Sequence, residues 1–154
     1  MNIFVFNEDP TICAQQHCDS HVVKMILETA QILSSVHWVT GGQAPYKLTH
    51  KNHPCSVWAR TCKENYDWLL SLGYELCKEY SFRYHRVHKS QLVLDTLKDS
   101  VPNIPTLGSR TEFVSAVSSN CKLICVMDSY KKYFNTEKRH LAKWTRREIP
   151  YWYN

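Results

Sequence analysis

The sequence predicts a mainly α-helical fold. We expect a compact single domain over residues 1–154, with about four to five helices and a short strand or extended segment at the N-terminus. Apolar residues recur every three or four positions in two long stretches, which is the period of a helix. Hydrophobic residues make up 44% of the chain and charged residues 21%, as in ordinary globular proteins. No internal repeat or low-complexity linker divides the chain, so these stretches should share one core.

The first expected element is a strand at about residues 2–6. Asp9-Pro10 then starts a helix, because aspartate caps helix N-termini and proline fits the first turn. This helix should continue to about Trp38 and end at Gly41-Gly42. A loop over residues 39–53 follows it.

A second long helix is expected from His53-Pro54 to about Tyr80, and a third, shorter helix at about residues 89–99. The prolines and the glycine of residues 101–108 predict a loop. Residues 111–127 fit either a strand or a buried helical turn, and a fourth helix is expected at about residues 128–142. The expected architecture is therefore two long helices packed together, with little β structure.

The first long helix carries a row of polar residues in an otherwise apolar segment. Their spacing of four, three, four and three positions is that of residues along one side of a helix. They are His17, His21, Lys24, Glu28 and Gln31. Apolar side chains cover most of the remaining circumference, which is typical of a helix inside a protein. Ionisable groups in such a place are unfavourable unless they are paired or hydrated.

Two interpretations of this polar row stay open. The row can line a pocket, where a base, an acid and a cation together favour catalysis, and then Lys24, Glu28, His21 and His17 are the candidate catalytic residues. A desolvated lysine can attack a sugar aldehyde, a carboxylate can stabilise a cationic sugar, and a histidine can protonate a leaving base or hold a phosphate. The row can instead form a buried ion-pair network, with Lys24 paired to Glu28 and the histidines hydrogen-bonded.

Positive charge is concentrated near the C-terminus. The chain has a formal net charge of +5, and its last segment alternates basic residues with tryptophan and tyrosine. This pattern is typical of surfaces that bind a phosphate backbone and an unstacked base, although aromatic residues can also anchor a tail to the core. The candidate nucleic-acid or phosphate contacts are Lys47, Lys51, Asn52, His53, Arg60, Arg83, Lys143, Trp144, Arg146 and Arg147.

The seven cysteines are odd in number and include no CxxC pair, so we expect free thiols in a reducing, cytoplasmic compartment. His17, Cys18 and His21 lack the paired spacing of a structural zinc site, and we expect neither a metal nor a cofactor. No apolar run reaches membrane-spanning length, and the N-terminus does not have the pattern of a signal peptide. The oligomeric state is not defined by any of these features.

The run Ala14-Gln15-Gln16-His17, followed by the polar helix, resembles the start of the phage pyrimidine-dimer DNA glycosylase family. The resemblance implies a compact all-α protein in which a buried helix carries a Gln-His pair and a catalytic glutamate. It also implies a long second helix, here residues 53–80, and an aromatic-basic tail, here residues 143–153. The opening is similar as well to small phage proteins without established activity, which share a strand, Asp-Pro and the motif His-Cys-Asp-x-His-Val-Val-Lys-Met.

The sequence departs from that family at two places that matter for chemistry. The family uses the α-amine of a small residue exposed by removal of the initiator methionine, but residue 2 here is asparagine, which favours retention of Met1. An ungapped match on Gln16-His17 places the family's catalytic glutamate on Lys24, with Glu28 one turn further along the helix. Either Glu28 supplies the carboxylate or the activity differs.

Three functions stay open at this level. The first is an enzyme that acts on a nucleobase or its glycosidic bond in DNA after base flipping. The second is a phage enzyme that modifies a DNA base or a nucleotide by group transfer. The third is a non-enzymatic protein that binds a nucleotide, as a phage counter-defence protein would. All three imply DNA or a nucleotide as partner and no membrane, and a phage origin would place the protein in the host cytoplasm.

Overall fold

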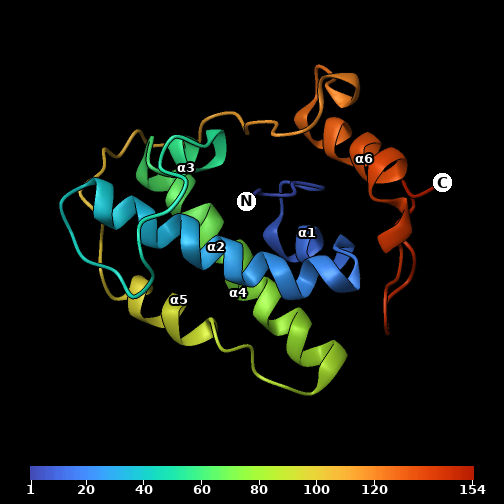
Figure 1. The fold of residues 1–154 in the computed structure, drawn as a ribbon, viewed down its shortest axis with the longest axis horizontal. Coiled ribbons are helices and arrows are strands. Elements are labelled where there is room, and N and C mark those ends of the chain that lie inside the picture. The colour runs from blue at the N-terminus through green and yellow to red at the C-terminus, as the bar shows by residue number, and fades with distance from the viewer.

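The computed structural model describes residues 1–154 and confirms the mainly α-helical class (Figure 1). It contains six α-helices, two short 3₁₀ helices and no strand. The α-helices are α1 (Pro10–Gln16), α2 (Asp19–Val39), α3 (Pro54–Ala59), α4 (Lys63–Tyr84), α5 (Gln91–Lys98) and α6 (Val126–Glu137). The 3₁₀ helices are η1 (Ser119–Cys121) and η2 (Arg139–Leu141). None of the helices combines the length and the apolar character that a membrane crossing requires.

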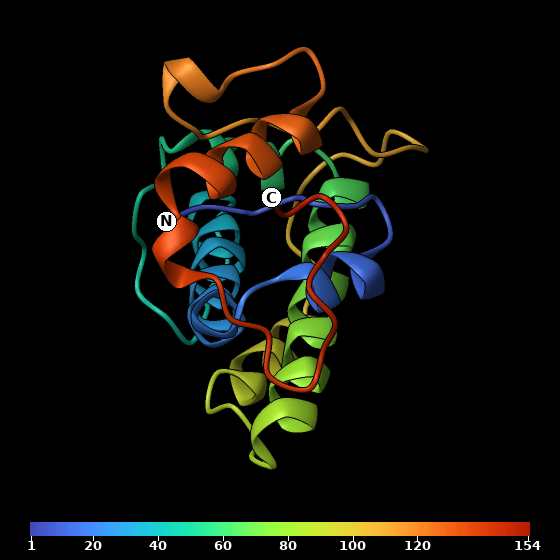
Figure 2. The ribbon, with the colours of Figure 1, turned by 90° about the vertical axis from the view of Figure 1, so that its right-hand side faces the viewer.

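The first residues of the chain form an extended segment inside the molecule, which is one of the two forms expected there, and not a strand. In Figure 2 this segment crosses from the side of α2 to the side of α4, with α6 above it. Residues 3–6 are all buried, and Phe4 and Phe6 contact Tyr130 and Phe134 of α6. The apolar character of residues 3–6 is therefore explained by their burial. They form no strand, because the surrounding helices offer no neighbouring strand with which to pair.

The first expected helix is divided into α1 and α2 by His17 and Cys18. Asp9 caps α1 as expected, since its side chain accepts hydrogen bonds from the backbone N–H groups of Thr11 and Ile12 at 2.7 and 3.2 Å. His17 ends α1 in an extended conformation, and its Nδ1 donates to the Cys13 carbonyl at 2.7 Å. This bond satisfies a carbonyl that a continuous helix would have used internally. The polar row consequently belongs to two elements and not to one.

The second expected helix is likewise two helices, α3 and α4, which meet at residues 60–62. Helix α4 continues to Tyr84, beyond the expected end at Tyr80, and stops at His85, which has a left-handed φ of 53°. Residues 111–125 form an extended connection that contains η1 and no strand. The fourth expected helix starts two residues early, as α6, and its last turn is η2.

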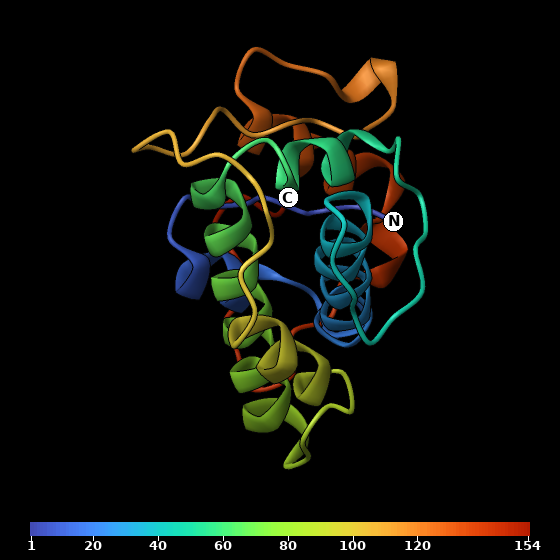
Figure 3. The same ribbon diagram turned by 90° about the vertical axis from the view of Figure 1, so that its left-hand side faces the viewer.

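The core lies between α2 and α4, which pack side by side with α3 across one end (Figure 3). It comprises 29 buried residues in one cluster. Gly73 allows this close packing, because a Cβ atom there would lie 3.0 Å from both Thr29 of α2 and Leu94 of α5. The C-terminal segment returns to the same core through Trp144 and Trp152. The fold thereby brings both ends of the chain beside α2.

Candidate active site

A pocket of about 430 Å³ lies where the chain start, the first half of α2 and the end of α6 meet. Three segments that are far apart in the sequence build its walls. The lining residues are Met1, Asn2, Phe4, Ser20, His21, Lys24, Met25, Glu28, Tyr133, Lys138 and Leu141. Three of the four candidate catalytic residues are therefore in one cavity, which supports the first interpretation of the polar row.

Glu28 lies at the centre of the polar contacts in this pocket. Its Oε2 accepts a hydrogen bond from the backbone N–H of Asn2 at 2.7 Å and lies 3.7 Å from the N-terminal ammonium of Met1. Its Oε1 lies 3.3 Å from Nζ of Lys24, one turn earlier on α2. The carboxylate is largely buried, and these two cations and one N–H group offset its loss of hydration.

The two residues whose amines contact Glu28 differ in the solvent exposure of their side chains. The side chain of Lys24 is 66% exposed, whereas that of Met1 is only 2% exposed. The expectation of a desolvated lysine is therefore wrong, because Lys24 extends from the rim of the pocket into solvent. The other amine belongs to Met1, a half-buried residue that the extended N-terminal segment carries to the carboxylate.

His17 does not line the pocket. Its ring is fully buried against Phe4 and Phe6, and its Nε2 has no hydrogen-bond partner. Burial lowers the pKa of His17 to about 4, so the ring is neutral at pH 7. Sequence analysis placed this residue among the catalytic candidates, but the break between α1 and α2 turns it into the core.

His21 lines the pocket with a ring that stacks on Phe4 at a centroid distance of 4.2 Å. Burial lowers the pKa of His21 to about 3, and His17 and the nearby charges of Lys138 and Lys24 act in the same direction. The ring is therefore neutral at pH 7. It contributes shape and an apolar face to the site, and it is a poor proton donor there.

Sequence analysis did not place in the site several polar and aromatic residues that the fold brings to the pocket. Met1 and Asn2 arrive through the extended segment, and Tyr133 and Lys138 arrive from α6 and its C-terminal end. Tyr133 lies 6.3 Å from the ring of Phe4, and Nζ of Lys138 lies 5.5 Å from the ring centroid of Tyr133. The pocket consequently combines an aromatic wall with several amines and one carboxylate.

A family comparison connects this geometry to known proteins. The model of the pyrimidine dimer DNA glycosylase family matches residues 1–92, which is more than half of the chain. The chain belongs to the pyrimidine dimer DNA glycosylase family. The matched region contains the chain start, α1 and α2, and hence Met1, Lys24 and Glu28. Membership confirms the resemblance found in the first helix, and it supports a DNA glycosylase-like function with DNA as the partner.

The match to this glycosylase family ends within α5, so Tyr133 and Lys138 lie beyond it. The chain has no significant match among curated proteins or among solved structures. The individual catalytic residues of this glycosylase family member must therefore be argued from its own pocket.

Two of the expected phosphate contacts are engaged within the protein. The Arg83 side chain is fully buried, donates to Glu79 at 2.7 Å and Asp19 at 2.9 Å, and also donates to the Gln15 carbonyl. Arg147 makes two hydrogen bonds of 2.9 Å to Glu79. Arg83 cannot reach a phosphate, which corrects the expectation for this residue. Asp19, which lies 64 positions away, is the partner that the sequence did not reveal.

Trp144 is also part of the fold and not a free stacking surface. It is buried against Phe134 and Tyr153, and its Nε1 donates to the Gln16 carbonyl at 3.0 Å. The backbone N–H of Asp19 donates to the Lys143 carbonyl at 2.8 Å. Trp144 and Trp152, which both donate to Gln16, thus anchor the tail to α1, as in the alternative considered for this segment, whereas Tyr151 is exposed.

The remaining basic candidates lie on the surface. Lys47, Lys51 and Asn52 are exposed in the loop before α3, and Lys143 and Arg146 are exposed in the C-terminal segment. Arg60 is half-buried and donates to the Lys51 carbonyl. His53 caps α3, and burial together with the N-terminal ammonium lowers the pKa of its ring, which places it near the chain start.

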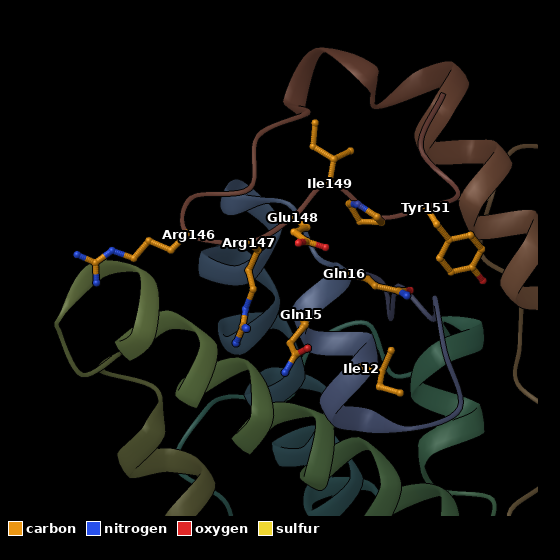
Figure 4. Close-up of a pocket in the computed structure, with 9 residues that line it drawn as sticks. Ile12, Gln15, Gln16, Arg146, Arg147, Glu148, Ile149 and Tyr151 are labelled. Atoms are coloured by element: carbon orange, nitrogen blue, oxygen red, sulfur yellow. The ribbon is translucent and has the colours of Figure 1, made fainter.

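A second hollow, of about 530 Å³, lies between α1 and the C-terminal segment (Figure 4). Gln15 and Gln16 of α1 face Arg147 and Glu148 across it, while the side chain of Arg146 extends away. Its only carboxylate, that of Glu148, is exposed and makes no ion pair. This hollow is larger than the first pocket, but no lysine or N-terminal amine lines it.

Proposed function

We propose that this protein is a DNA glycosylase that cleaves the glycosidic bond of a pyrimidine nucleotide by attack of an amine on C1′ of the sugar. One observation carries the proposal: the α-amine of the chain start lies 3.7 Å from the Glu28 carboxylate in a pocket of about 430 Å³. The family to which the chain belongs supplies the reaction class. The family's use of an α-amine and a glutamate is consistent with this pair of groups.

Of the two amines in the pocket, the α-amine is the better nucleophile. Only the unprotonated form attacks carbon, and α-amines as a class lose their proton near pH 8, whereas lysine side chains do so above about pH 10. Met1 is also half-buried, with its side chain packed inside, while the Lys24 side chain is mostly in solvent. In this proposal Lys24 holds Glu28 and attracts the phosphate backbone, and Glu28 takes the carboxylate role.

The reaction proceeds through an imine. The nitrogen lone pair forms a bond to C1′ while the bond between C1′ and the base breaks, and the base leaves with that electron pair and takes a proton from solvent. The nitrogen then loses a proton to Glu28, and its lone pair expels O4′, which is protonated as the sugar ring opens. Water hydrolyses the imine, which restores the amine and leaves an abasic sugar aldehyde.

Glu28 contributes to this reaction in two ways. Its carboxylate accepts the proton that the attacking nitrogen must lose, and its charge stabilises the cationic sugar of the transition state. Its hydrogen bond to the Asn2 N–H holds the chain start at a fixed distance, so that the amine needs little reorganisation before attack. The exposed residues Lys47, Lys51, Asn52, Lys143 and Arg146 remain our candidates for phosphate contacts outside the pocket.

The proposal is tested by incubating the full chain with duplex DNA that contains a single pyrimidine dimer and analysing the product by mass spectrometry. We expect an abasic site from the native protein and about 100-fold less of it from Glu28→Gln, with full activity in the control variant Glu75→Gln, which is partly exposed on α4. Unchanged DNA would contradict the proposal. A heavier base would show group transfer, and stoichiometric binding without a product would show a non-enzymatic role.

A further inference from the structure

The side chain of Asn2 is held by hydrogen bonds at both ends of its amide. Its Nδ2 donates to the Ala116 carbonyl at 3.0 Å, and its Oδ1 accepts from the hydroxyl of Tyr130 at 2.8 Å. Oδ1 also accepts from the N–H of Ile3 at 2.8 Å. Residue 2 is thus fixed by groups more than a hundred positions away in the sequence, which sequence analysis did not anticipate.

Tyr130 completes a closed ring of hydrogen bonds around this amide. It is fully buried on α6, and its hydroxyl accepts from the Ala116 N–H at 3.1 Å while it donates to Asn2. Burial raises the pKa of Tyr130 well above its ordinary range, so the hydroxyl keeps its proton at every working pH. Hydrogen bonds in such a dry environment reinforce one another, so the ring is a rigid support.

We propose that Asn2 and Tyr130 are positioning residues that hold the chain start against Glu28. This inference rests on the proposed function, since it explains how a chain terminus can serve as a nucleophile. Termini are ordinarily mobile, but here Tyr130 and Ala116 hold the side chain of Asn2, an arrangement that we call the clamp. The clamp directs the backbone N–H of Asn2 to Glu28 at 2.7 Å. The same clamp serves whether the free amine belongs to Met1 or, after removal of Met1, to Asn2.

The clamp also gives the C-terminal third of the chain a part in the reaction. Tyr130 and Ala116 lie outside the region matched by the family model, yet they hold the residue next to the proposed nucleophile. A misplacement of the amine by about one ångström is enough to lower the rate of an attack by orders of magnitude. Tyr130 therefore acts through Asn2 and does not contact the substrate.

The variant Tyr130→Phe removes the hydroxyl and keeps the ring that packs against Phe4. Its matched control is Tyr66→Phe, because Tyr66 is also buried and its hydroxyl lies 2.8 Å from His37 Nε2, away from the pocket. Asn2→Ala is a second test variant that leaves α6 intact. Intact-mass spectrometry of each protein first identifies which residue carries the free amine.

The first measurement needs no enzymatic activity. The folded proteins are treated with a limiting amount of an amine-acylating reagent, and modification of the chain start is followed by mass spectrometry. We expect slow acylation in the native protein and in Tyr66→Phe, and several-fold faster acylation in Tyr130→Phe and Asn2→Ala. Equal acylation in all four proteins would overturn the inference that Asn2 and Tyr130 hold the chain start, even if the proposed function is correct.

The second measurement is the single-turnover rate of borohydride trapping on abasic-site DNA, below the melting temperature of every variant. We expect Tyr130→Phe to trap about tenfold more slowly at unchanged DNA affinity, and Tyr66→Phe to trap at the native rate. Equal losses in both tyrosine variants would show a structural role only and overturn the inference. If the native protein forms no trapped adduct with DNA, the proposed function is overturned. The acylation rates would still test whether Asn2 and Tyr130 hold the chain start.

Discussion

Two clusters of charged residues include side chains of α2, Asp19 in one and Glu28 in the other, and they differ in how completely their charges are paired. In one cluster, Glu79 uses both oxygens for Arg147 and shares one of them with Arg83, which also binds Asp19. In the other, Glu28 contacts one exposed lysine and the chain start, beside a cavity of about 430 Å³. The first cluster is a structural ion-pair network, and the second keeps its groups available to a ligand.

The difference shows that ionisable residues in an apolar segment can either stabilise the fold or serve a ligand site, and that composition alone does not distinguish these roles. A buried arginine whose three side-chain nitrogens each donate to a protein oxygen stabilises the fold and is out of reach of a substrate. A carboxylate that lies between two amines at the edge of a cavity can exchange protons with them. Removing residues from each cluster should therefore affect different properties of the protein.

The largest effect is expected from Arg83→Met in the paired cluster. The substitution leaves Asp19 without its buried partner and removes one of the two arginines from Glu79. Breaking such a buried network should lower the free energy of unfolding by about 3–5 kcal/mol. Denaturant unfolding measures this loss, and activity per folded molecule should be unchanged. A loss below about 1 kcal/mol would contradict the assignment of the cluster as structural.

Acid should weaken the fold through the two histidines that lie between the clusters. The unfolded chain protonates these rings near pH 6.5, whereas the folded chain resists protonation down to about pH 4 at His17 and about pH 3 at His21. The free energy of unfolding is therefore highest above pH 6.5 and falls as acid is added, by roughly 3 kcal/mol at pH 4 for His17 alone.

Urea unfolding at a series of pH values between 7 and 4 tests this expectation. The variant His17→Asn has no titrating ring at this position, so its stability should depend less steeply on pH than that of the native protein. Stability that stays constant from pH 7 to pH 4.5 would show that the rings are not buried as described.

Glu28→Gln should lower the activity and leave the stability nearly unchanged, which is the opposite of the result expected for Arg83→Met. We expect a loss of glycosylase activity of about 100-fold, because the attacking nitrogen loses its proton acceptor. The free energy of unfolding should change by less than about 1 kcal/mol, since Lys24 is already hydrated. Steady-state kinetics and unfolding of the same preparation measure both. A large loss of stability with native activity would show that Glu28 has a structural and not a catalytic role.

The smallest effect is expected from Lys24→Ala. The exposed pair with Glu28 should contribute only about 0.3–0.5 kcal/mol to stability. Activity should fall only a few-fold and through weaker DNA binding, with the loss growing as the salt concentration is lowered. Titration of DNA affinity against salt measures this effect. Complete loss of turnover would instead identify Lys24 as the nucleophile.

Local signals in the sequence were sufficient for part of this account. The helical class, the Asp9 cap and the contact between Lys24 and Glu28 depend on residues at most four positions apart. Such patterns are visible without the fold, because the helix itself sets the spacing. The break at His17 was missed because it depends on how one side chain hydrogen-bonds to the preceding turn.

The remaining features depend on contacts between distant parts of the chain. The chain start reaches Glu28 over 26 positions, Arg83 finds Asp19 over 64, and Tyr130 holds Asn2 over 128. No periodic pattern encodes such partners, so the burial of Arg83 and the membership of Tyr133 and Lys138 in the pocket emerged only from the fold, which also decided between the two roles considered for Trp144. The exposed lysine was misjudged for the same reason, since the rim of a pocket is a tertiary feature.

The most direct test of the central claim is to map the covalent adduct that borohydride traps between this protein and abasic-site DNA. After digestion, tandem mass spectrometry locates the modified nitrogen. The α-amine at the chain start is the expected site, with the same adduct in Lys24→Ala. An adduct on Lys24, or none at all from folded protein that binds the DNA, would contradict the assignment of the α-amine and Glu28 as the catalytic pair.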